Sequence, residues 1–155
     1  MALKPMLAAA LIVSTTASLA YAGGHGGNPA VKARKSHMQL YAHNLGIIGG
    51  MARGSVEYNA ENAMAAANNL AALTSLDQRS YWVPGTSNAE LGDETRLLPA
   101  AFEADSKAIE ISGQLAAAAE ALAAVAGDGQ AALGPALGPV GAACGACHEA
   151  YQQPR

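Results

Sequence analysis

Hydrophobic residues recur at helical spacing in four segments of the chain, which are separated by stretches of glycine, proline and polar residues. The first segment opens at Asn28 and Pro29, a capping residue followed by a proline suited to the first helical position. Counted in heptads from Val31, one line of positions holds Met38, Leu45 and Ala52, and the adjacent line holds Arg34, Tyr41 and Ile48. This pattern predicts a helix to about Met51 with one buried stripe.

The second predicted helix begins at the cap residue Asn59 and ends near Asp77. Its apolar positions are Ala63, Ala66, Leu70, Leu73 and Leu76. From Asp77 to Arg96 the sequence has a Pro-Gly pair at 84–85 and no sustained period, which predicts a long surface connection.

The third predicted helix runs from about Pro99 to Ala126, with Ile109 on its buried side. The fourth occupies residues 130–152, where Pro135 and Pro139 interrupt the opening turns, so that regular helix is expected from Pro139 onward. Four helices with two short connections and one long crossing loop predict an all-α fold, an antiparallel four-helix bundle.

The core of this predicted bundle is thin. The chain has 155 residues, enough for one domain, and its alanine-rich composition with one Phe and one Trp favours helix over sheet. Many positions on the predicted buried lines are alanine, which buries far less apolar area than leucine or phenylalanine. A large apolar group is therefore expected in the interior.

The first 22 residues are typical of a cleaved secretory signal peptide. They contain one basic residue, Lys4, an apolar run over residues 6–13 and the small-x-small pattern Ala20-Tyr21-Ala22. A membrane anchor is the alternative, but the apolar run is shorter than the roughly 20 residues that cross a bilayer. We therefore predict an exported domain over residues 23–155, located in the periplasm and without stable membrane insertion.

The charge of the exported domain is mildly acidic. Cleavage removes Lys4 and no acidic residue, so eight basic residues face twelve acidic ones and the formal net charge becomes −4. No basic stripe indicates binding to nucleic acid or to an anionic membrane surface. The acidic surface allows electrostatic docking to a basic patch on a partner protein.

A motif near the C-terminus carries the chemistry. In Cys144-Gly145-Ala146-Cys147-His148 the two cysteines lie three apart, so both sulfur atoms reach the same side of a helix and His148 projects beside them. This CxxCH pattern is the attachment site of c-type haem, in which two thioether bonds hold the porphyrin and the imidazole binds iron. A haem c group would also supply the apolar volume that the alanines leave unfilled.

Three other interpretations of the motif are weaker. A structural zinc site needs four ligands, and only the distant His25, His37 and His43 remain to complete one. A thioredoxin-like redox pair follows a strand, which is not predicted here. A plain disulfide in mid-helix is geometrically awkward and leaves His148 without a role.

The sequence resembles the class II c-type cytochromes, whose best-known members are the bacterial cytochromes c′. The resemblance covers the whole exported region and includes AVKARKSHM at 30–38, the start of the second helix at 58–60, VPGTS at 83–87 and VGAACGACHEAY at 140–151. It implies that Cys144 and Cys147 bear the haem, His148 is the proximal iron ligand, Arg34 lies near a propionate and Met38 sits over the distal face. Many cytochromes c′ have a basic residue four positions after the proximal histidine, where this chain has Gln152.

Two functional hypotheses differ in whether Met38 binds the haem iron. A Met38 thioether bound to iron makes a six-coordinate, low-spin haem suited to carrying single electrons. If Met38 only packs there, the iron is five-coordinate and binds a small gas such as NO or CO. His37 would compete as a ligand, but it lies about 100° around the helix and should face away from the haem. Arg34 has a second interpretation, as a solvated flank of the helix.

The expected partners are periplasmic or membrane redox proteins, together with a small gas ligand in the five-coordinate case. No hydrolase, transferase or phosphate-binding spacing is present in the sequence, which argues against an enzyme. The resembled family often dimerises through its first two helices, and Gly46, Gly49 and Gly50 would permit close packing in such a homodimer. The sequence leaves monomer and dimer open.

Overall fold

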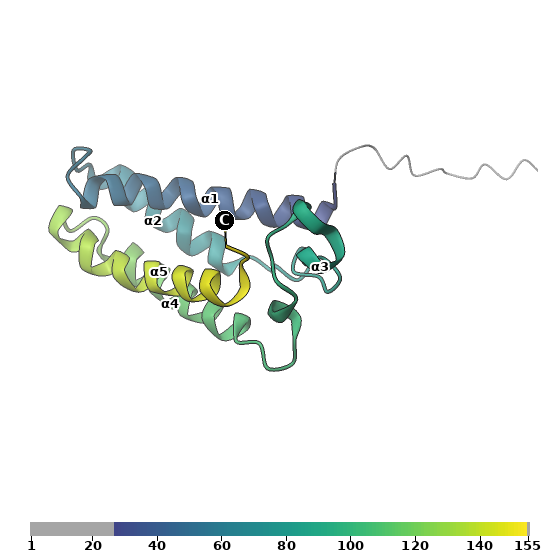
Figure 1. The fold of residues 1–155 in the computed structure, drawn as a ribbon. Helices are drawn as coiled ribbons and strands as arrows, with labels where there is room; N and C mark the ends of the chain where they lie inside the picture. Colours follow the sequence, from purple (N-terminus) through teal and green to yellow (C-terminus); the bar gives the residue numbers. More distant parts are fainter. Residues whose placement is uncertain (1–26, 155) are drawn as a thin grey trace, which may run out of the picture.

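A computed structural model describes residues 27–154, and over this range the chain forms an all-α four-helix bundle, which confirms the predicted fold class. The four main helices are α1 (Pro29–Ala52), α2 (Ala60–Ser75), α4 (Ala108–Val125) and α5 (Gln130–Tyr151). The α1–α2 hairpin packs on the α4–α5 hairpin, and the short helix α3 (Asn88–Leu91) lies at the end of the bundle where α1 begins (Figure 1). The predicted signal peptide, residues 1–22, and His25 fall outside the described residues.

Both helix starts that were predicted from capping residues are confirmed. The side chain of Asn28 accepts hydrogen bonds from the backbone N–H groups of Ala30 and Val31, at 2.9 and 3.3 Å. Asn59 accepts one from the N–H of Asn62 at 2.9 Å. These caps satisfy N–H groups that have no partner inside the helix, so the local sequence stabilises both termini.

The prediction for the third helix was wrong at its start. Pro99–Phe102 forms a separate 3-10 turn, η2, and α4 begins only at Ala108. Ser106 stops the first turn and starts the next helix, since its hydroxyl donates to the carbonyl of Ala101 and accepts from the N–H of Ala108. Ile109, predicted on the buried side, is 89% exposed.

The prediction for the fourth helix was also wrong at its start. Regular helix was expected only from Pro139, whereas α5 is continuous from Gln130 through both prolines. Pro135 and Pro139 lie on its exposed side, where the carbonyls of Ala131 and Pro135 lose their helical N–H partners but face water. A proline on the solvent side of a helix is tolerated because water replaces the missing hydrogen bond.

The long connection is more buried than predicted. It contains α3, a 3-10 turn η1 (Gly92–Glu94) and η2, and its polar residues Thr86, Ser87 and Thr95 are buried. Leu97 pairs with Gln152 in an isolated antiparallel bridge, which fixes the end of the connection to the end of α5. The connection thus forms part of the wall of the bundle rather than a surface loop.

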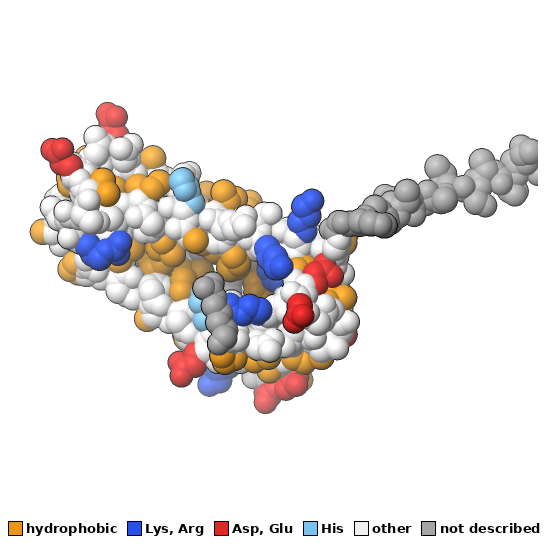
Figure 2. Space-filling view, turned by 45° about the horizontal axis from the view of Figure 1, so that its top comes forward, with side chains coloured by type: hydrophobic (Ala, Val, Ile, Leu, Met, Phe, Trp, Pro, Cys, Tyr) orange, Lys and Arg blue, Asp and Glu red, His pale blue; other side chains and the backbone are white. Residues whose placement is uncertain are grey.

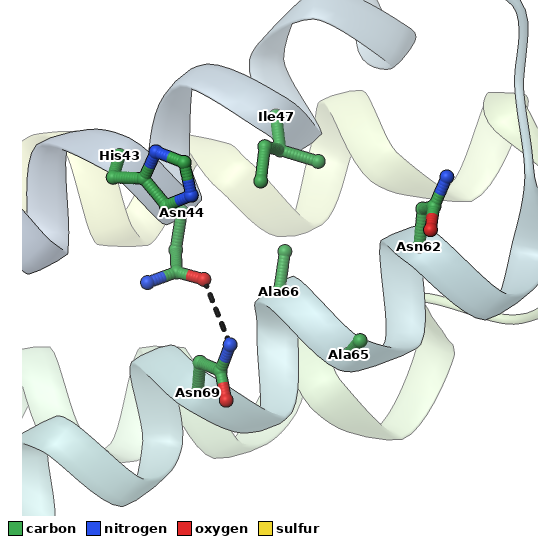
Figure 3. A pocket seen from close by; sticks show the side chains of 7 residues that line it. All are labelled: His43, Asn44, Ile47, Asn62, Ala65, Ala66 and Asn69. Carbon is green, nitrogen blue, oxygen red and sulfur yellow. Dashed lines mark hydrogen bonds between the residues drawn. The ribbon is translucent and has the colours of Figure 1, made fainter.

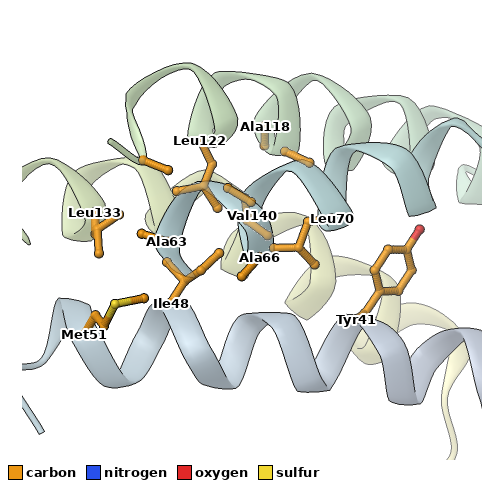
Figure 4. Close-up of a cluster of buried hydrophobic side chains, with 13 residues drawn as sticks. Tyr41, Ile48, Met51, Ala63, Ala66, Leu70, Ala118, Leu122, Leu133 and Val140 are labelled. Atoms are coloured by element: carbon orange, nitrogen blue, oxygen red, sulfur yellow. The ribbon is translucent and has the colours of Figure 1, made fainter. Parts of the chain in front are cut away.

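A cluster of buried hydrophobic side chains fills one half of the bundle (Figure 4). Its large members include Ile48, Leu70, Leu122 and Leu133, all at most 2% exposed. Alanines from α2 and α4 complete it, which brings the helix backbones close together and agrees with the alanine-rich core expected from the sequence.

Two features of the helix surfaces bear on the predicted homodimer contact and on membrane insertion. Gly49 and Gly50 are buried within the protein, and a Cβ atom at Gly50 would lie 3.1 Å from the Val56 side chain. These two glycines therefore serve packing inside the protein, and only Gly46 is exposed for contact with a second copy. The helix α4 is long and apolar enough to cross a membrane by length and composition alone, a test that alanine-rich helices of soluble bundles also pass.

Candidate functional site

The CxxCH motif lies in the last two turns of α5. Cys144 and Cys147 are free thiols, partly buried, on the same side of the helix. Burial raises the pKa of both thiols, and the neighbouring Cys144 adds to the rise at Cys147. His148 is exposed, and its backbone carbonyl accepts the last helical hydrogen bond of α5, from the N–H of the C-cap residue Gln152 at 3.1 Å. The structure thus presents two thiols and an imidazole from one rigid helical segment.

Apolar side chains near this motif remain only partly buried. They come from three helices and pack against the edge of the core: Met38 and Leu45 of α1, Leu115 of α4, and Leu137 and Cys144 of α5. Of the four neighbouring helix pairs in the bundle, α1 and α5 contact each other least. On the face shown in Figure 2, hydrophobic side chains form much of the surface midway along the molecule, and charged side chains lie toward its two ends. A large apolar group bonded to α5 fits these surroundings.

Arg34 is the second feature of the site, and it is buried at 4% exposure, which excludes a solvated flank. Its Nη1 donates to the carbonyl of Tyr81 at 3.0 Å and to Oγ1 of Thr86 at 3.1 Å. Its Nη2 donates to the carbonyl of Thr86 at 2.9 Å and to Oγ1 of Thr95 at 3.2 Å. One arginine therefore holds three separate positions of the long connection against α1.

The charge of Arg34 is not balanced by a carboxylate. Among residues 27–154 the guanidinium forms no ion pair, and besides its four hydrogen bonds to neutral oxygens the ring of Trp82 lies 5.3 Å from Cζ. Burial lowers the pKa of Arg34 below its usual value, but an arginine stays protonated at neutral pH. A buried cation without an anion is the chemical environment in which a ligand carboxylate would be stabilised.

A cluster of three rings beside Arg34 was missed by sequence reasoning. His37 is 5% exposed, and its Nδ1 lies 2.6 Å from the hydroxyl of Tyr81. Its ring packs against Tyr41 and Tyr81 with centroid separations of 4.5 and 5.6 Å. The sequence predicted that His37 would face away from the haem side, whereas the structure places it on the buried stripe of α1 with Arg34 and Tyr41. Nothing in the pattern pointed to Tyr81 as its partner, because that contact spans 44 positions and ends in an irregular segment.

Tyr41 connects this ring cluster to α5. Burial raises the pKa of Tyr41 to about 12, with further contributions from the nearby Tyr81 and Cys144. Tyr41 therefore lies between the His37 ring and the first cysteine of the motif, so α1, the long connection and α5 meet at this position.

The zinc interpretation gains no support from the structure. Within residues 27–154 no group of three or more His, Cys, Asp or Glu side chains could hold a metal ion. The motif itself supplies two thiols and one imidazole from a single helix, which suits a covalently bound haem.

A second concave feature lies away from the motif, between α1 and α2. It is a groove of about 300 Å³ lined by His43, Asn44 and Ile47 of α1 and by Asn62, Ala65, Ala66 and Asn69 of α2. The amide of Asn69 donates to Oδ1 of Asn44 at 3.1 Å across its floor (Figure 3). The exposed hydrophobic residues Leu40, Ile47 and Met64 belong to the same two helices.

Comparison with known proteins agrees with this site. The family model described as cytochrome C′ matches residues 29–152. A cytochrome c-554 from Cereibacter sphaeroides is 42% identical over 124 residues, which covers 79% of this chain and 80% of that protein. A solved cytochrome c′ from Rhodobacter sphaeroides is 32% identical with a TM-score of 0.77, covering 81% of this chain and 96% of that chain.

Two further solved relatives are described with ligands. A cytochrome c′ with a ligand-controlled dimer dissociation is 33% identical with a TM-score of 0.72, covering 81% and 95% of the two chains. A nitric oxide complex of a variant cytochrome c′ from Alcaligenes xylosoxidans is 28% identical with a TM-score of 0.69, covering 81% and 94%.

Proposed function

This chain belongs to the cytochrome c′ family and carries one covalently attached c-type haem, and from that premise we propose that it binds a small diatomic gas such as NO or CO on the distal side of a five-coordinate iron. Proteins of this family are haem proteins of electron transfer or gas binding and are periplasmic in bacteria. The predicted signal peptide supports a periplasmic location for this chain, and an N-terminus at Gly23 in the exported protein would verify it.

The residues that would hold the haem come from both sides of the bundle. Cys144 and Cys147 would form the two thioether bonds, and His148 would bind the iron from the same helix. Arg34 would stabilise a propionate, because it is buried and forms no ion pair with a described carboxylate. When bound, the haem supplies an iron that exchanges one electron and accepts a diatomic ligand.

The observation that carries the gas-binding proposal is the environment of Met38. Its side chain packs against the hydrophobic core cluster, as a methionine that fills apolar space does. The solved nitric oxide complex of a relative shows that the fold accommodates a gas ligand in that protein. In this chain Met38 would then crowd the distal side and exclude larger ligands.

A second candidate function is electron transfer through a haem with His148 and Met38 as axial ligands. It is favoured by one observation, that Met38 is a thioether on the α1 side of the motif and is not fully buried in the core. A methionine ligand raises the haem potential and suits a carrier of single electrons.

Absorption spectra of the ferric and ferrous protein, with and without CO, separate the two functions. Gas binding predicts a high-spin ferric spectrum, CO binding to the ferrous form, and little change of spin state in Met38→Ala. Met64→Ala, on the exposed side of α2, is the matched control. A low-spin spectrum that becomes high spin only in Met38→Ala would establish the electron carrier instead.

One solved relative is described as a dimer whose dissociation is ligand-controlled. By analogy, we propose that this chain forms a homodimer through the α1–α2 face. The groove between these helices and the exposed Leu40 and Ile47 of α1 support this contact. Sedimentation velocity should show a dimer for the wild type and a monomer for Ile47→Glu. A monomeric wild type at all concentrations would contradict this assembly.

A further inference from the structure

Tyr81 is held by α1 at two points one helical turn apart. Its backbone carbonyl accepts from Nη1 of Arg34 at 3.0 Å, and its hydroxyl lies 2.6 Å from Nδ1 of His37. The long connection is therefore fixed to α1 through both the main chain and the side chain of one residue.

The hydrogen bond between Tyr81 and His37 joins two neutral groups. Desolvation by burial lowers the pKa of His37 and raises the pKa of Tyr81, so at neutral pH the phenol keeps its proton and the imidazole is uncharged. The hydroxyl of Tyr81 then donates to Nδ1, and the ring proton of His37 sits on Nε2, a buried atom with no hydrogen-bond partner among the described residues. Leaving Nε2 unpaired is unfavourable, so the ring orientation is set by the Nδ1 bond and by packing on Tyr41.

Met38 lies on α1 close to the residues that take part in these contacts. On the surface of α1 its neighbours are Arg34 four residues before it, His37 immediately before it and Tyr41 three residues after it. All three are buried and engaged with the long connection or with each other, whereas Met38 itself makes only apolar contacts. The hydrogen bonds to Tyr81 therefore resist a shift of the part of α1 that carries Met38.

We propose that Tyr81 and His37 are positioning residues, whose hydrogen bond holds Met38 over the distal side of the haem and so sets the affinity for a diatomic ligand. This role rests on the proposed haem site and deepens it, because Tyr81 and His37 act through Met38 rather than on the gas itself. Loss of the bond removes one of the two links between Tyr81 and α1, loosens the His37 ring beside Met38 and opens the distal side.

The test compares two variants that each remove one hydroxyl. Tyr81→Phe removes the bond to His37, whereas Tyr58→Phe removes bonds at the other end of the bundle, where the Tyr58 hydroxyl donates to the carbonyl of Ala126 and accepts from the N–H of Gly129. We expect Tyr81→Phe to tighten CO binding by about three- to fivefold, the equivalent of one buried hydrogen bond. Tyr58→Phe should lower the melting temperature at least as much and leave CO affinity unchanged.

Three further variants distinguish positioning of Met38 from general loosening of the fold. In a Met38→Ala background, Tyr81→Phe should no longer change CO affinity, because the side chain through which it acts is absent. His37→Leu removes the other partner of the bond and should tighten CO binding in the same direction, with no additional effect in the double variant with Tyr81→Phe.

The positioning role is overturned if Tyr81→Phe binds CO as the wild type does, or if its effect persists without Met38. Failure of the proposed gas-binding function would be a different result, a low-spin wild type in which Met38 binds iron. In that case the positioning role predicts that CO displaces Met38 more readily in Tyr81→Phe than in the wild type, and equal displacement overturns it.

Discussion

The two ends of the bundle are built differently. At the closed end, where the α1–α2 and α4–α5 turns meet, Ile48, Met51, Leu122 and Leu133 are at most 2% exposed and fill the space between the helices. At the haem end, which we define by the CxxCH motif, the first half of α4 and the long connection, Met38 and Leu115 remain partly exposed. The closed end is stabilised by its own side chains, and the haem end is shaped for a bound group.

The difference explains how an alanine-rich sequence forms a stable bundle. Complete burial of a leucine-sized side chain stabilises a protein by about 1.5–3 kcal/mol, and Ile48, Met51, Leu122 and Leu133 supply such burial at the closed end. At the haem end, polar contacts hold the wall in place instead, chiefly the four hydrogen bonds of Arg34. The covalent haem then supplies the apolar contacts that the protein does not make there.

The largest effect is expected when the haem end loses its covalent group. The double variant Cys144→Ser, Cys147→Ser should contain no covalently bound haem on a denaturing gel, and its melting temperature should fall by roughly 10 °C or more. Hydrogen exchange should show lost protection at residues 108–116 and 141–151, with protection kept around Leu122. Cys144→Ser alone, which retains one thiol, is the control and should still hold haem. Uniform loss of protection in the double variant would contradict the division into two ends.

A smaller effect is expected from substituting two leucines that lie seven residues apart on the same face of α4, Leu122 at the closed end and Leu115 at the haem end. Leu122→Ala empties part of the closed end and should lower the free energy of unfolding by about 2–5 kcal/mol without altering the haem spectrum. Leu115→Ala should change the spectrum and, because Leu115 is already partly exposed, destabilise the haem-free double-serine protein by much less. Equal destabilisation of that haem-free protein by the two substitutions would remove the distinction between the ends.

The main helices were largely predictable from the sequence because their determinants are local. The caps Asn28 and Asn59 and the spacing of apolar residues defined α1 and α2 to within a few residues. The start of α5 was predicted too late because a proline inside a helix removes one hydrogen bond and is expected to interrupt it. The sequence does not show that the carbonyl left without a partner faces water. Ile109 was misplaced because a helical period was continued across Ser106, where the chain turns.

The haem end was predictable only in part. The CxxCH motif identified the helix and the three residues of the haem site, because that chemistry is contained in five consecutive residues. The partners of Arg34 and His37 lie 44 to 61 positions away in an irregular segment, where no period relates the residues in contact. Such contacts depend on tertiary structure, which is why burial of the connection was not foreseen.

The smallest effect tests whether the ends are independent along α5. Pro135 is exposed on the closed-end half of the helix and cannot donate to the carbonyl of Ala131, so Pro135→Ala restores one helical hydrogen bond. The gain in helix propensity is offset in part by the greater entropy of the unfolded chain, and we expect a net stabilisation of about 1 kcal/mol. Pro84→Ala, in the long connection, gains no helical bond and should leave stability equal or slightly lower. Thermal unfolding measures both variants, and the haem spectrum of Pro135→Ala should match the wild type. A changed spectrum would mean that Pro135 determines the position of Cys144, and the two ends would then be coupled through α5 rather than built separately.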